Sequence, residues 1–258
     1  MMDALKSLVG RSDAARRAVR WARRRTAAFP TRATFWDGTA RPTGRYVAYM
    51  LRHWREHPSL RQESDDAYAA YDGGDVLDVG AFHGWYAVLL SPKAKPGSTF
   101  VLMEPDPEAY PALLVTLAAL AETFPHLHYV ALPLAAGDGR AVRAVYPLGP
   151  EGHPRFEPSS DPEDGAAARL DELASGLGLA PTFAKVDVEG AELYVLRGME
   201  RILDRRATTL MVELHPEWQP SGVTVDEAVA PLRARGFASR TLTEAPESVR
   251  TLWTPASP

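Results

Sequence analysis

The stretch "DVLDVGAFHGWYAVLLS", residues 75–91, joins a strand pattern to a helix pattern through a glycine turn. Its first part, residues 75–80, is a short apolar run that follows the turn signal "DGG", as a buried strand does. Its second part has the pattern of a helix, and "KPG" at 95–97 ends it. A buried strand that passes directly into a helix predicts one unit of a parallel α/β sheet.

The same alternation of strand and helix patterns continues along the chain. Strand-type runs recur at residues 98–104, 128–136, 182–189 and 208–215, and a helix-type pattern lies in each interval between them. Asp106 is expected to cap the first of these helices, whose leucines at helical spacing are Leu113, Leu114, Leu117 and Leu120. The closing run 237–254 holds two extended segments joined by "EAPES", which predicts an antiparallel hairpin.

Residues 1–70 are interpreted as a helical cap on a single α/β domain that spans residues 71–258. One face of the segment "TGRYVAYMLRHWREH" (43–57) carries apolar residues at helical spacing, namely Val47, Met50, Leu51 and Trp54. The segment 147–165 holds too much proline, glycine and charge for a regular element. We expect an irregular loop there.

Composition indicates a globular protein of a reducing compartment. The 258-residue chain has no cysteine, which excludes disulfides and thiolate metal sites. No apolar run approaches the roughly 20 residues that a membrane span needs, and the N-terminus lacks the apolar core of a signal peptide. We therefore expect a soluble, cytoplasmic protein.

Seven arginines lie between residues 11 and 25, although the net charge of the chain is −4. Such a segment suits a weak contact with phosphate or with an anionic membrane surface. The alternative is the solvated face of an N-terminal helix. No aromatic stacking platform or nucleic-acid motif accompanies the segment, so no nucleic-acid partner is expected.

Ligands of open parallel sheets bind at the carboxyl ends of the strands, so the residues at those ends are informative. The first strand and its turn carry Asp78, Gly80, Ala81 and Gly84. Gly80 permits a tight turn, and the following helix offers free N–H groups to an anion. Glu104 ends the second strand, 24 residues after Gly80, where a carboxylate accepts the hydroxyl protons of a ribose. The glycines follow G-x-x-x-G rather than G-x-G-x-x-G, so S-adenosylmethionine fits better than a dinucleotide.

Six segments, in this order and spacing, resemble FkbM-family methyltransferases over roughly residues 70–215: "VLDVGAFHGWYAVLL", "VLMEPDPEAYPALL", "LAAGDG", "RLDEL", "KVDVEGAELYVLRGMERIL" and "MVELH". The resemblance implies S-adenosylmethionine as cofactor and a hydroxyl of a sugar, glycan or natural product as methyl acceptor. Through "LAAGDG" it also places Asp138 at the cofactor, although a plain turn residue is the alternative. Phe82 and His83 stand where the family turn commonly reads G-A-N-x-G.

The resemblance implies a class I methyltransferase fold, which is Rossmann-like. Its sheet is seven-stranded and mostly parallel, with helices on both faces and a reversed C-terminal hairpin. The hairpin agrees with the antiparallel pair expected from residues 237–254. The loop 147–165 and the cap 1–70 are expected to select the acceptor.

Charged residues gather at the ends of the predicted strands 182–189 and 208–215. Lys185, Asp187 and Glu189 share one strand face by the two-residue period. Glu213 and His215 end the next strand at the same edge of the sheet. Because an alcohol is weakly acidic, a hydroxyl acceptor benefits from a base or a metal ion that removes its proton.

Two mechanisms follow from these charges. In the first, His215 or Asp187 is the general base, and Glu189 and Glu192 position the acceptor. In the second, Asp187, Glu213 and His215 hold a divalent ion of the Mg type, which lowers the pKa of the acceptor.

Structural roles are the alternatives for the same residues. Asp187 or Glu189 would cap the following helix, since acids are favoured at helix N-termini. Lys185 would neutralise the acids instead of contacting substrate. Glu192 would face Arg197 or solvent.

Two other classes of function compete with methyl transfer. A nicotinamide-dependent oxidoreductase would keep the acid at 104 but predicts a third glycine in the turn, and position 82 is Phe. A non-catalytic binding module, tethered through the arginine-rich segment, would leave the acids of residues 185–192 without a role. Methylation of a nucleobase is disfavoured, because residues 187–190 read "DVEG" where such enzymes carry Asn-Pro-Pro-aromatic.

Overall fold

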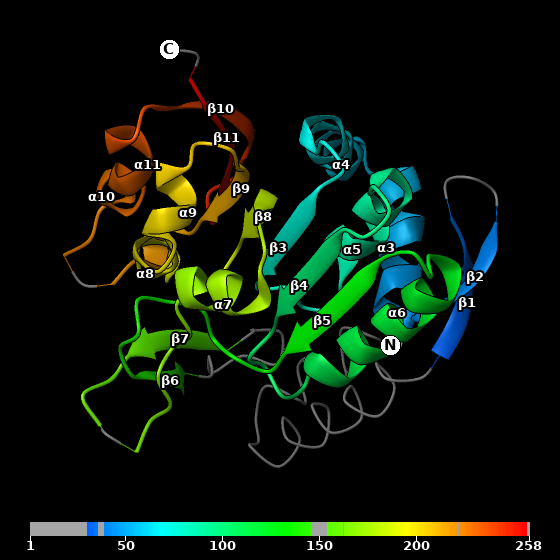
Figure 1. Cartoon of the computed structure of the whole chain (residues 1–258), viewed down its shortest axis with the longest axis horizontal. Helices are drawn as coiled ribbons and strands as arrows, with labels where there is room; N and C mark the ends of the chain where they lie inside the picture. Colours follow the sequence, from blue (N-terminus) through cyan, green and yellow to red (C-terminus); the bar gives the residue numbers. More distant parts are fainter. Residues whose placement is uncertain (1–29, 36–38, 146–153, 162, 221, 257–258) are drawn as a thin grey trace, which may run out of the picture.

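A seven-stranded sheet forms the centre of the protein, as the computed structural model shows for residues 30–35, 39–145, 154–161, 163–220 and 222–256. Its strand order is β10-β11-β9-β8-β3-β4-β5 (Figure 1). The strands are β3 (Asp75–Val79), β4 (Thr99–Met103), β5 (His128–Leu132), β8 (Pro181–Val186), β9 (Thr209–Leu214), β10 (Phe237–Glu244) and β11 (Val249–Pro255). The predicted Rossmann-like sheet is confirmed.

The order in which the chain visits the strands opens a crevice at their carboxyl ends. Strands β8, β3, β4 and β5 pair in parallel, and β9 pairs in parallel with β8. The chain runs outward from β3 through β4 to β5, then returns to the other side of β3 and continues through β8 to β9. Such a reversal between neighbouring strands separates the loops that leave them and opens a ligand site. Strands β10 and β11 form the predicted antiparallel hairpin, with β11 against β9.

Helices cover both faces of the sheet. They are α5 (Trp85–Leu90), α6 (Tyr110–Thr123), α7 (Leu170–Leu177), α8 (Glu192–Arg197), α9 (Glu200–Asp204), α10 (Val225–Ala228) and α11 (Ala230–Ala234), with short 3-10 turns at Ser91–Lys93 and Pro216–Trp218. Alternate residues of a strand point to opposite faces, so in β4 Phe100 and Leu102 join one core and Val101 and Met103 the other. Strands buried on both faces require this continuous apolar run.

The N-terminal part contains a hairpin that the helical interpretation of residues 1–70 did not predict. Strands β1 (Pro30–Thr34) and β2 (Ala40–Gly44) pair antiparallel, and helices α3 (Arg45–Glu56) and α4 (Pro58–Ala70) follow. Prolines at 30 and 42 disfavour a helix interior but are tolerated in a two-stranded ribbon. Helix α3 is present as predicted, and Val47 and Leu51 are buried in the core that also holds Leu113 of α6. The domain boundary at residue 70 stays a prediction.

Several predicted elements end earlier than the sequence pattern suggests. The strand predicted at 128–136 ends at Leu132, and the strand predicted at 182–189 ends at Val186. The predicted loop 147–165 contains strand β7 (Arg155–Pro158), which pairs with β6 (Val142–Val145). A two-stranded ribbon of this kind depends on its partner, so neither strand has a strong pattern of its own.

Two helix starts also differ from the prediction. Helix α6 begins at Tyr110 rather than next to Asp106, whose Oδ1 accepts the N–H of Glu108 at 2.8 Å in a turn before the helix. The helix expected over residues 190–206 is divided into α8 and α9. The carboxylate of Asp171 caps the second part, because it accepts the N–H groups of Arg201 and Ile202.

Part of the sequence-based interpretation lies outside the described residues. The arginine-rich segment 11–25 and residues 147–153 of the predicted loop belong to this part. Within the part of the chain that the structure describes, no helix combines the length and the apolar character needed to cross a membrane.

Neighbouring leucines of α6 provide a test of the core. The side chain of Leu113 is fully buried, whereas Leu114 is 46% exposed. We expect Leu113→Ala to lower the free energy of unfolding by about 2–5 kcal/mol, because it removes buried methyl groups and leaves a cavity. Leu114→Ala should change it by less than about 0.5 kcal/mol. Chemical denaturation followed by circular dichroism measures both, and equal losses would contradict the packing described here.

Candidate active site

A cavity of about 290 Å³ lies at the carboxyl ends of the central strands. Its size is near the lower limit, roughly 300 Å³, of pockets that bind small molecules. The loops after β3, β4, β5 and β8 supply most of its wall, and residues of β7, β9 and β11 complete it. The lining residues include Gly80, Phe82, Glu104, Asp106, Ala135, Phe156, Asp187, Glu189, Glu213 and Arg250.

The glycine turn after β3 is fastened to β4. The N–H groups of Gly80 and Ala81 both donate to the carbonyl of Met103 at 3.0 Å. Gly80 has a φ of 77°, and a Cβ at this position would lie 1.8 Å from the carbonyl oxygen of Asp187. Only glycine therefore permits this close approach of the turn to the loop after β8.

Glu104 closes the same turn from the end of β4. Its Oε2 accepts the N–H of Phe82 at 2.6 Å, and its Oε1 accepts the N–H of Asp106 at 2.8 Å. The residue is 6% exposed, and burial raises its pKa to about 7 against the opposing effect of the two amide bonds. The carboxylate is thus held on the cavity wall where the ribose-binding acid was predicted.

The acidic turn after β8 does not follow the two-residue period of a strand. Strand β8 ends at Val186, so Asp187 and Glu189 do not belong to it. The prediction that Lys185, Asp187 and Glu189 share one strand face is therefore wrong. Glu189 adopts the left-handed conformation (φ 56°), and Gly190 follows with φ 103°. A Cβ on Gly190 would lie 2.0 Å from the carbonyl oxygen of Trp218. This backbone turn, rather than strand alternation, directs Asp187 and Glu189 into the cavity.

Neither acid of this turn caps the following helix, contrary to the structural alternative. Helix α8 has Ala191 at its N-cap, without a side-chain hydrogen bond. Glu189 points its Oε2 toward His215 instead, and burial and the charge of Asp187 raise the pKa of Glu189 to about 7. Burial opposes the charge of Asp187, but the ammonium of Lys185 holds the pKa of this carboxyl below its ordinary value.

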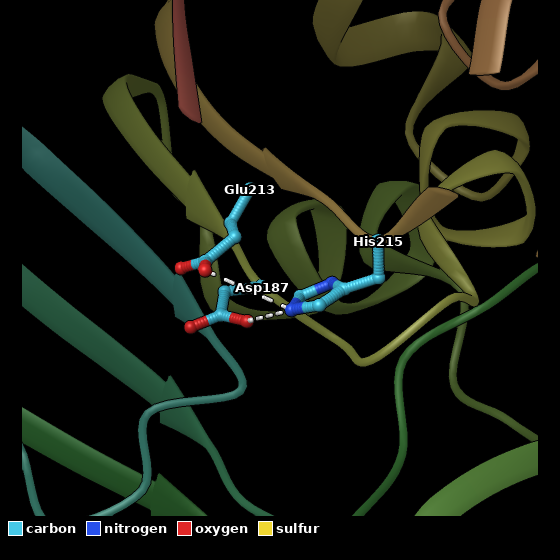
Figure 2. Close-up of side chains that lie close together, drawn as sticks. All are labelled: Asp187, Glu213 and His215. Carbon is cyan, nitrogen blue, oxygen red and sulfur yellow. Dashed lines mark ion pairs between the residues drawn. The ribbon is translucent and has the colours of Figure 1, made fainter. Parts of the chain in front are cut away.

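His215, directly after β9, meets four carboxylates. Its Nε2 lies 3.9 Å from Oδ1 of Asp187, 3.7 Å from Oε1 of Glu213 and 3.5 Å from Oε2 of Glu189 (Figure 2). Its Nδ1 lies 3.1 Å from Oε1 of Glu192. Burial lowers the pKa of the imidazole, but the hydrogen bond to Glu192 and the surrounding charges raise it to about 9. An imidazolium has no free lone pair, which opposes the predicted role of His215 as a neutral base near pH 7.

Glu192 is fully buried, not exposed or paired with Arg197 as the structural alternative had it. It is not among the lining residues either, so its predicted role in positioning the acceptor stays a prediction. Its carboxylate accepts the N–H of Gly190 at 2.9 Å and the side-chain amide of Gln219 at 2.6 Å, in addition to the contact with His215. Glu192 therefore orients the imidazole of His215 through its Nδ1.

Lys185 lies beneath the cavity instead of lining it. Its Nζ donates to the carbonyl of Gly80 at 2.6 Å and lies 3.1 Å from Oδ2 of Asp187 and 3.8 Å from Oδ1 of Asp78. Burial lowers the pKa of the lysine, but the two carboxylates raise it above its ordinary value. Lys185 is thus the neutralising partner that the structural alternative described.

Three of the predicted cofactor residues, Asp78, Ala81 and Gly84, are not among the residues that line the cavity. Asp78 is 1% exposed, and burial raises its pKa to about 6 against the attraction of Lys185. Asp138, the fourth, lies 2.7 Å from Arg140 through each of two contacts, away from the lining residues.

The cavity wall also contains residues that sequence reasoning missed. Arg250 on β11 lies 2.7 Å from Oε2 of Glu213 and 3.0 Å from Oε2 of Glu63 on α4. Glu63 is itself buried and accepts the hydroxyl proton of Tyr86 at 2.5 Å. Phe156 comes from the segment expected to be a loop. An arginine within an apolar strand, "VRTLW", is the one signal that pointed to Arg250.

A model of the FkbM methyltransferase domain matches residues 78–239, which is well over half of the chain. No curated protein matches the chain in sequence.

Three solved structures are among those similar to this chain. The methyltransferase FkbM from Methylobacillus flagellatus is 13% identical with a TM-score of 0.50, covering 92% of this chain, which spans only 58% of that protein. A putative O-methyltransferase from Klebsiella pneumoniae is 12% identical, with a TM-score of 0.46. The match covers 83% of this chain and 92% of that protein. Fibrillarin from Aeropyrum pernix, with bound S-adenosylmethionine, is 13% identical, with a TM-score of 0.42. The match covers 86% of this chain and 93% of that protein.

The raised pKa of Glu104 predicts a pH dependence of stability. Between pH 4.5 and about 7 this carboxyl ionises in the unfolded chain but stays protonated in the folded one, so the free energy of unfolding falls as pH rises. The full effect is about 3 kcal/mol. We expect Glu104→Gln to remove this loss of stability. The free energy of unfolding of the variant, relative to that of the wild type, should therefore rise from pH 4.5 to 7.5.

Denaturant titrations at several pH values measure this difference. Glu172→Gln is the matched control, since the side chain of Glu172 is 71% exposed. Parallel pH profiles of wild type and Glu104→Gln would show that Glu104 titrates normally.

Proposed function

Because the chain belongs to the FkbM methyltransferase domain family, we propose that it transfers a methyl group from S-adenosylmethionine to a hydroxyl of a sugar, glycan or natural product. The observation that carries the proposal is a single cavity with two chemically different walls. Glu104 and the glycine turn form one wall, and Asp187, Glu189, Glu213 and Arg250 form the other.

The first wall has the groups that S-adenosylmethionine needs. The amides of Phe82 and Asp106 hold the carboxylate of Glu104 in place, and each oxygen keeps a second acceptor position for a ribose hydroxyl. The cofactor supplies an electrophilic methyl group on its sulfonium. Gly80 keeps the turn close to the loop after β8, so a cofactor on the turn would be next to the acidic wall.

The second wall suits a hydroxyl acceptor. Carboxylates of Asp187 and Glu213 accept hydrogen bonds from hydroxyls, and the guanidinium of Arg250 donates to oxygens. Asp187 stays ionised, because Lys185 lowers its pKa. Holding the acceptor oxygen in line with the methyl group is the main task in such a transfer, and fixed side chains achieve it.

Activation of the hydroxyl is the remaining step. Of the two predicted routes, a neutral His215 base is opposed by the charge that its neighbours impose on the imidazole. The second route needs a divalent ion at Asp187, Glu213 and His215, whose ligand atoms lie within 4.8 Å of one another. Family membership favours methyl transfer over the nicotinamide-dependent oxidation and the non-catalytic module considered from the sequence.

Cofactor binding tests the first wall. We expect calorimetric titration of the wild type with S-adenosylhomocysteine to show binding, and Glu104→Ala to weaken it about 10- to 100-fold, because a charged acceptor of ribose hydroxyls is lost. The exposed Glu172→Ala is the control and should bind like wild type. No binding by folded wild type would exclude the methyltransferase proposal, and unchanged binding by Glu104→Ala would exclude the ribose contact.

Turnover tests the second wall. With tritiated S-adenosylmethionine and a panel of glycosides and polyhydroxylated natural products, we expect label in a base-stable ether. Asp187→Asn should lower turnover at least about 100-fold, a typical loss for a group that handles the reacting proton. Its affinity for S-adenosylhomocysteine should stay within about threefold of wild type, since the first wall is intact.

The chemical stability of the product provides the opposite outcome. Label released as methanol by mild base would indicate a methyl ester and hence a carboxyl acceptor. Undiminished turnover by Asp187→Asn would make Asp187 a purely structural residue.

A further inference from the structure

The side chains of Asp187, Glu213 and His215 converge on one point of the acidic wall (Figure 2). The geometry points to a binding site for one divalent cation of the Mg²⁺ or Mn²⁺ type between these three residues. Only the use of the ion in methyl transfer rests on the proposed function, since binding of the ion does not require it.

The spacing of the three ligand atoms fits a single small ion. The Nε2 of His215 lies 3.9 Å from Oδ1 of Asp187 and 3.7 Å from Oε1 of Glu213, and all three atoms lie within 4.8 Å of one another. Two atoms that are each about 2.1 Å from one octahedral ion are about 3 Å apart when adjacent and about 4.2 Å apart when opposite. At least two of the three pairs must be adjacent, so side-chain movements of roughly half an ångström would complete the site.

Each carboxylate presents one oxygen to the site and uses the other for a fixed cation. Oδ2 of Asp187 lies 3.1 Å from Nζ of Lys185, which leaves Oδ1 toward His215. Oε2 of Glu213 lies 2.7 Å from Nε of Arg250, which leaves Oε1 toward His215. Ligands oriented in this way by partners behind them are typical of metal sites.

The imidazole of His215 is oriented in the same manner. Its side chain is 5% exposed, and its Nδ1 lies 3.1 Å from the buried carboxylate of Glu192. An ionised carboxylate only accepts hydrogen bonds, so Nδ1 carries a hydrogen and Nε2 faces Asp187 and Glu213. A divalent ion would displace the proton of Nε2, whose lone pair would then point to the ion. A second carboxylate bonded to the far nitrogen of a histidine ligand is the arrangement that raises its affinity for a metal.

The contacts of Nε2 are long for hydrogen bonds. A good N–H···O bond spans about 2.7–3.2 Å, whereas the three oxygens facing Nε2 lie at 3.5, 3.7 and 3.9 Å. An ion bound between nitrogen and oxygen holds them farther apart than a shared proton does. These distances therefore suit a metal ion better than a proton.

The charge of the cluster also favours a cation. Five carboxylates surround three basic side chains, those of Lys185, Arg250 and His215. The carboxylates are Glu63, Asp187, Glu189, Glu192 and Glu213. Oε2 of Glu189 is buried without a hydrogen-bond partner and lies 3.5 Å from Nε2 of His215. Buried carboxylates are costly unless paired, so a divalent ion would compensate this excess and gain Glu189 as a nearby oxygen.

The ion would act on the acceptor, because Asp187 and Glu213 line the cavity. A hydroxyl bound to a divalent cation has a lower pKa and ionises near neutral pH without a protein base.

Titration of the full chain with MnCl₂, followed by electron paramagnetic resonance of the free ion, tests the proposal. We expect one bound Mn²⁺ per chain, displaced by Mg²⁺. Glu213→Gln should weaken binding at least about tenfold. Glu192→Gln, which removes the negative charge next to Nδ1 of His215 but none of the three ligands, should weaken it about 10- to 100-fold. Glu104→Gln is the control, because it changes a buried carboxylate on the opposite wall of the same cavity and should leave Mn²⁺ binding unchanged.

Two results would overturn the site: no bound Mn²⁺ in the wild type, or equal Mn²⁺ affinity in all variants. Thermal melting establishes that each variant is folded, and Glu192→Gln replaces Glu213→Gln if loss of the Arg250 partner unfolds the latter. A parallel titration with S-adenosylhomocysteine separates the two proposals. Binding of the nucleoside without Mn²⁺ would remove only the ion site, and binding of Mn²⁺ without the nucleoside would remove only the methyltransferase function.

Discussion

The buried ammonium of Lys185 joins the two sides of the cavity. Its Nζ donates to the carbonyl of Gly80 in the glycine turn and lies 3.1 Å from Asp187 in the acidic turn. A lysine that is 6% exposed keeps its charge only when anions surround it, and Asp78 and Asp187 provide them. This charged contact joins the glycine turn to the acidic turn next to β3 and β8, the strands where the chain reverses its direction of travel across the sheet. The N–H of Asp187 also donates to the carbonyl of Val79 at 3.0 Å.

A second series of ion pairs, from buried Glu63 through half-buried Arg250 to Glu213, connects the N-terminal helices to the acidic wall. Glu63 of α4 pairs with Arg250 of β11, and Arg250 pairs with Glu213 of β9. A buried charge that loses its partner is strongly destabilising, so these residues constrain one another. Glu63 and Arg250 both lie outside the residues that match the family domain, 78–239. The part of this chain beyond that match therefore helps to orient a residue of the cavity wall.

The acidic wall depends as much on backbone conformation as on charge. Glu189 and Gly190 both have positive φ, which turns the chain sharply between β8 and α8. A non-glycine residue in this conformation is strained, and such strain persists where surrounding contacts fix it. Here the loop after β9 supplies those contacts, since the carbonyl of Trp218 packs against Gly190 and Glu192 is bonded to both Gly190 and His215.

The sequence by itself determined the sheet, the helices that cover it, the C-terminal hairpin and the place of Glu104, because these follow from apolar periodicity and from residues close in the chain. It also predicted that Asp187, Glu213 and His215 lie at the same edge of the sheet, because the carboxyl ends of parallel strands meet there. It did not predict the β1–β2 hairpin, the contact of Glu192 with His215, or the position of Arg250 on the cavity wall. Only the tertiary structure decided these, because pairing between buried charges requires partners that are distant in sequence, and no local pattern records which partner a charged side chain will meet.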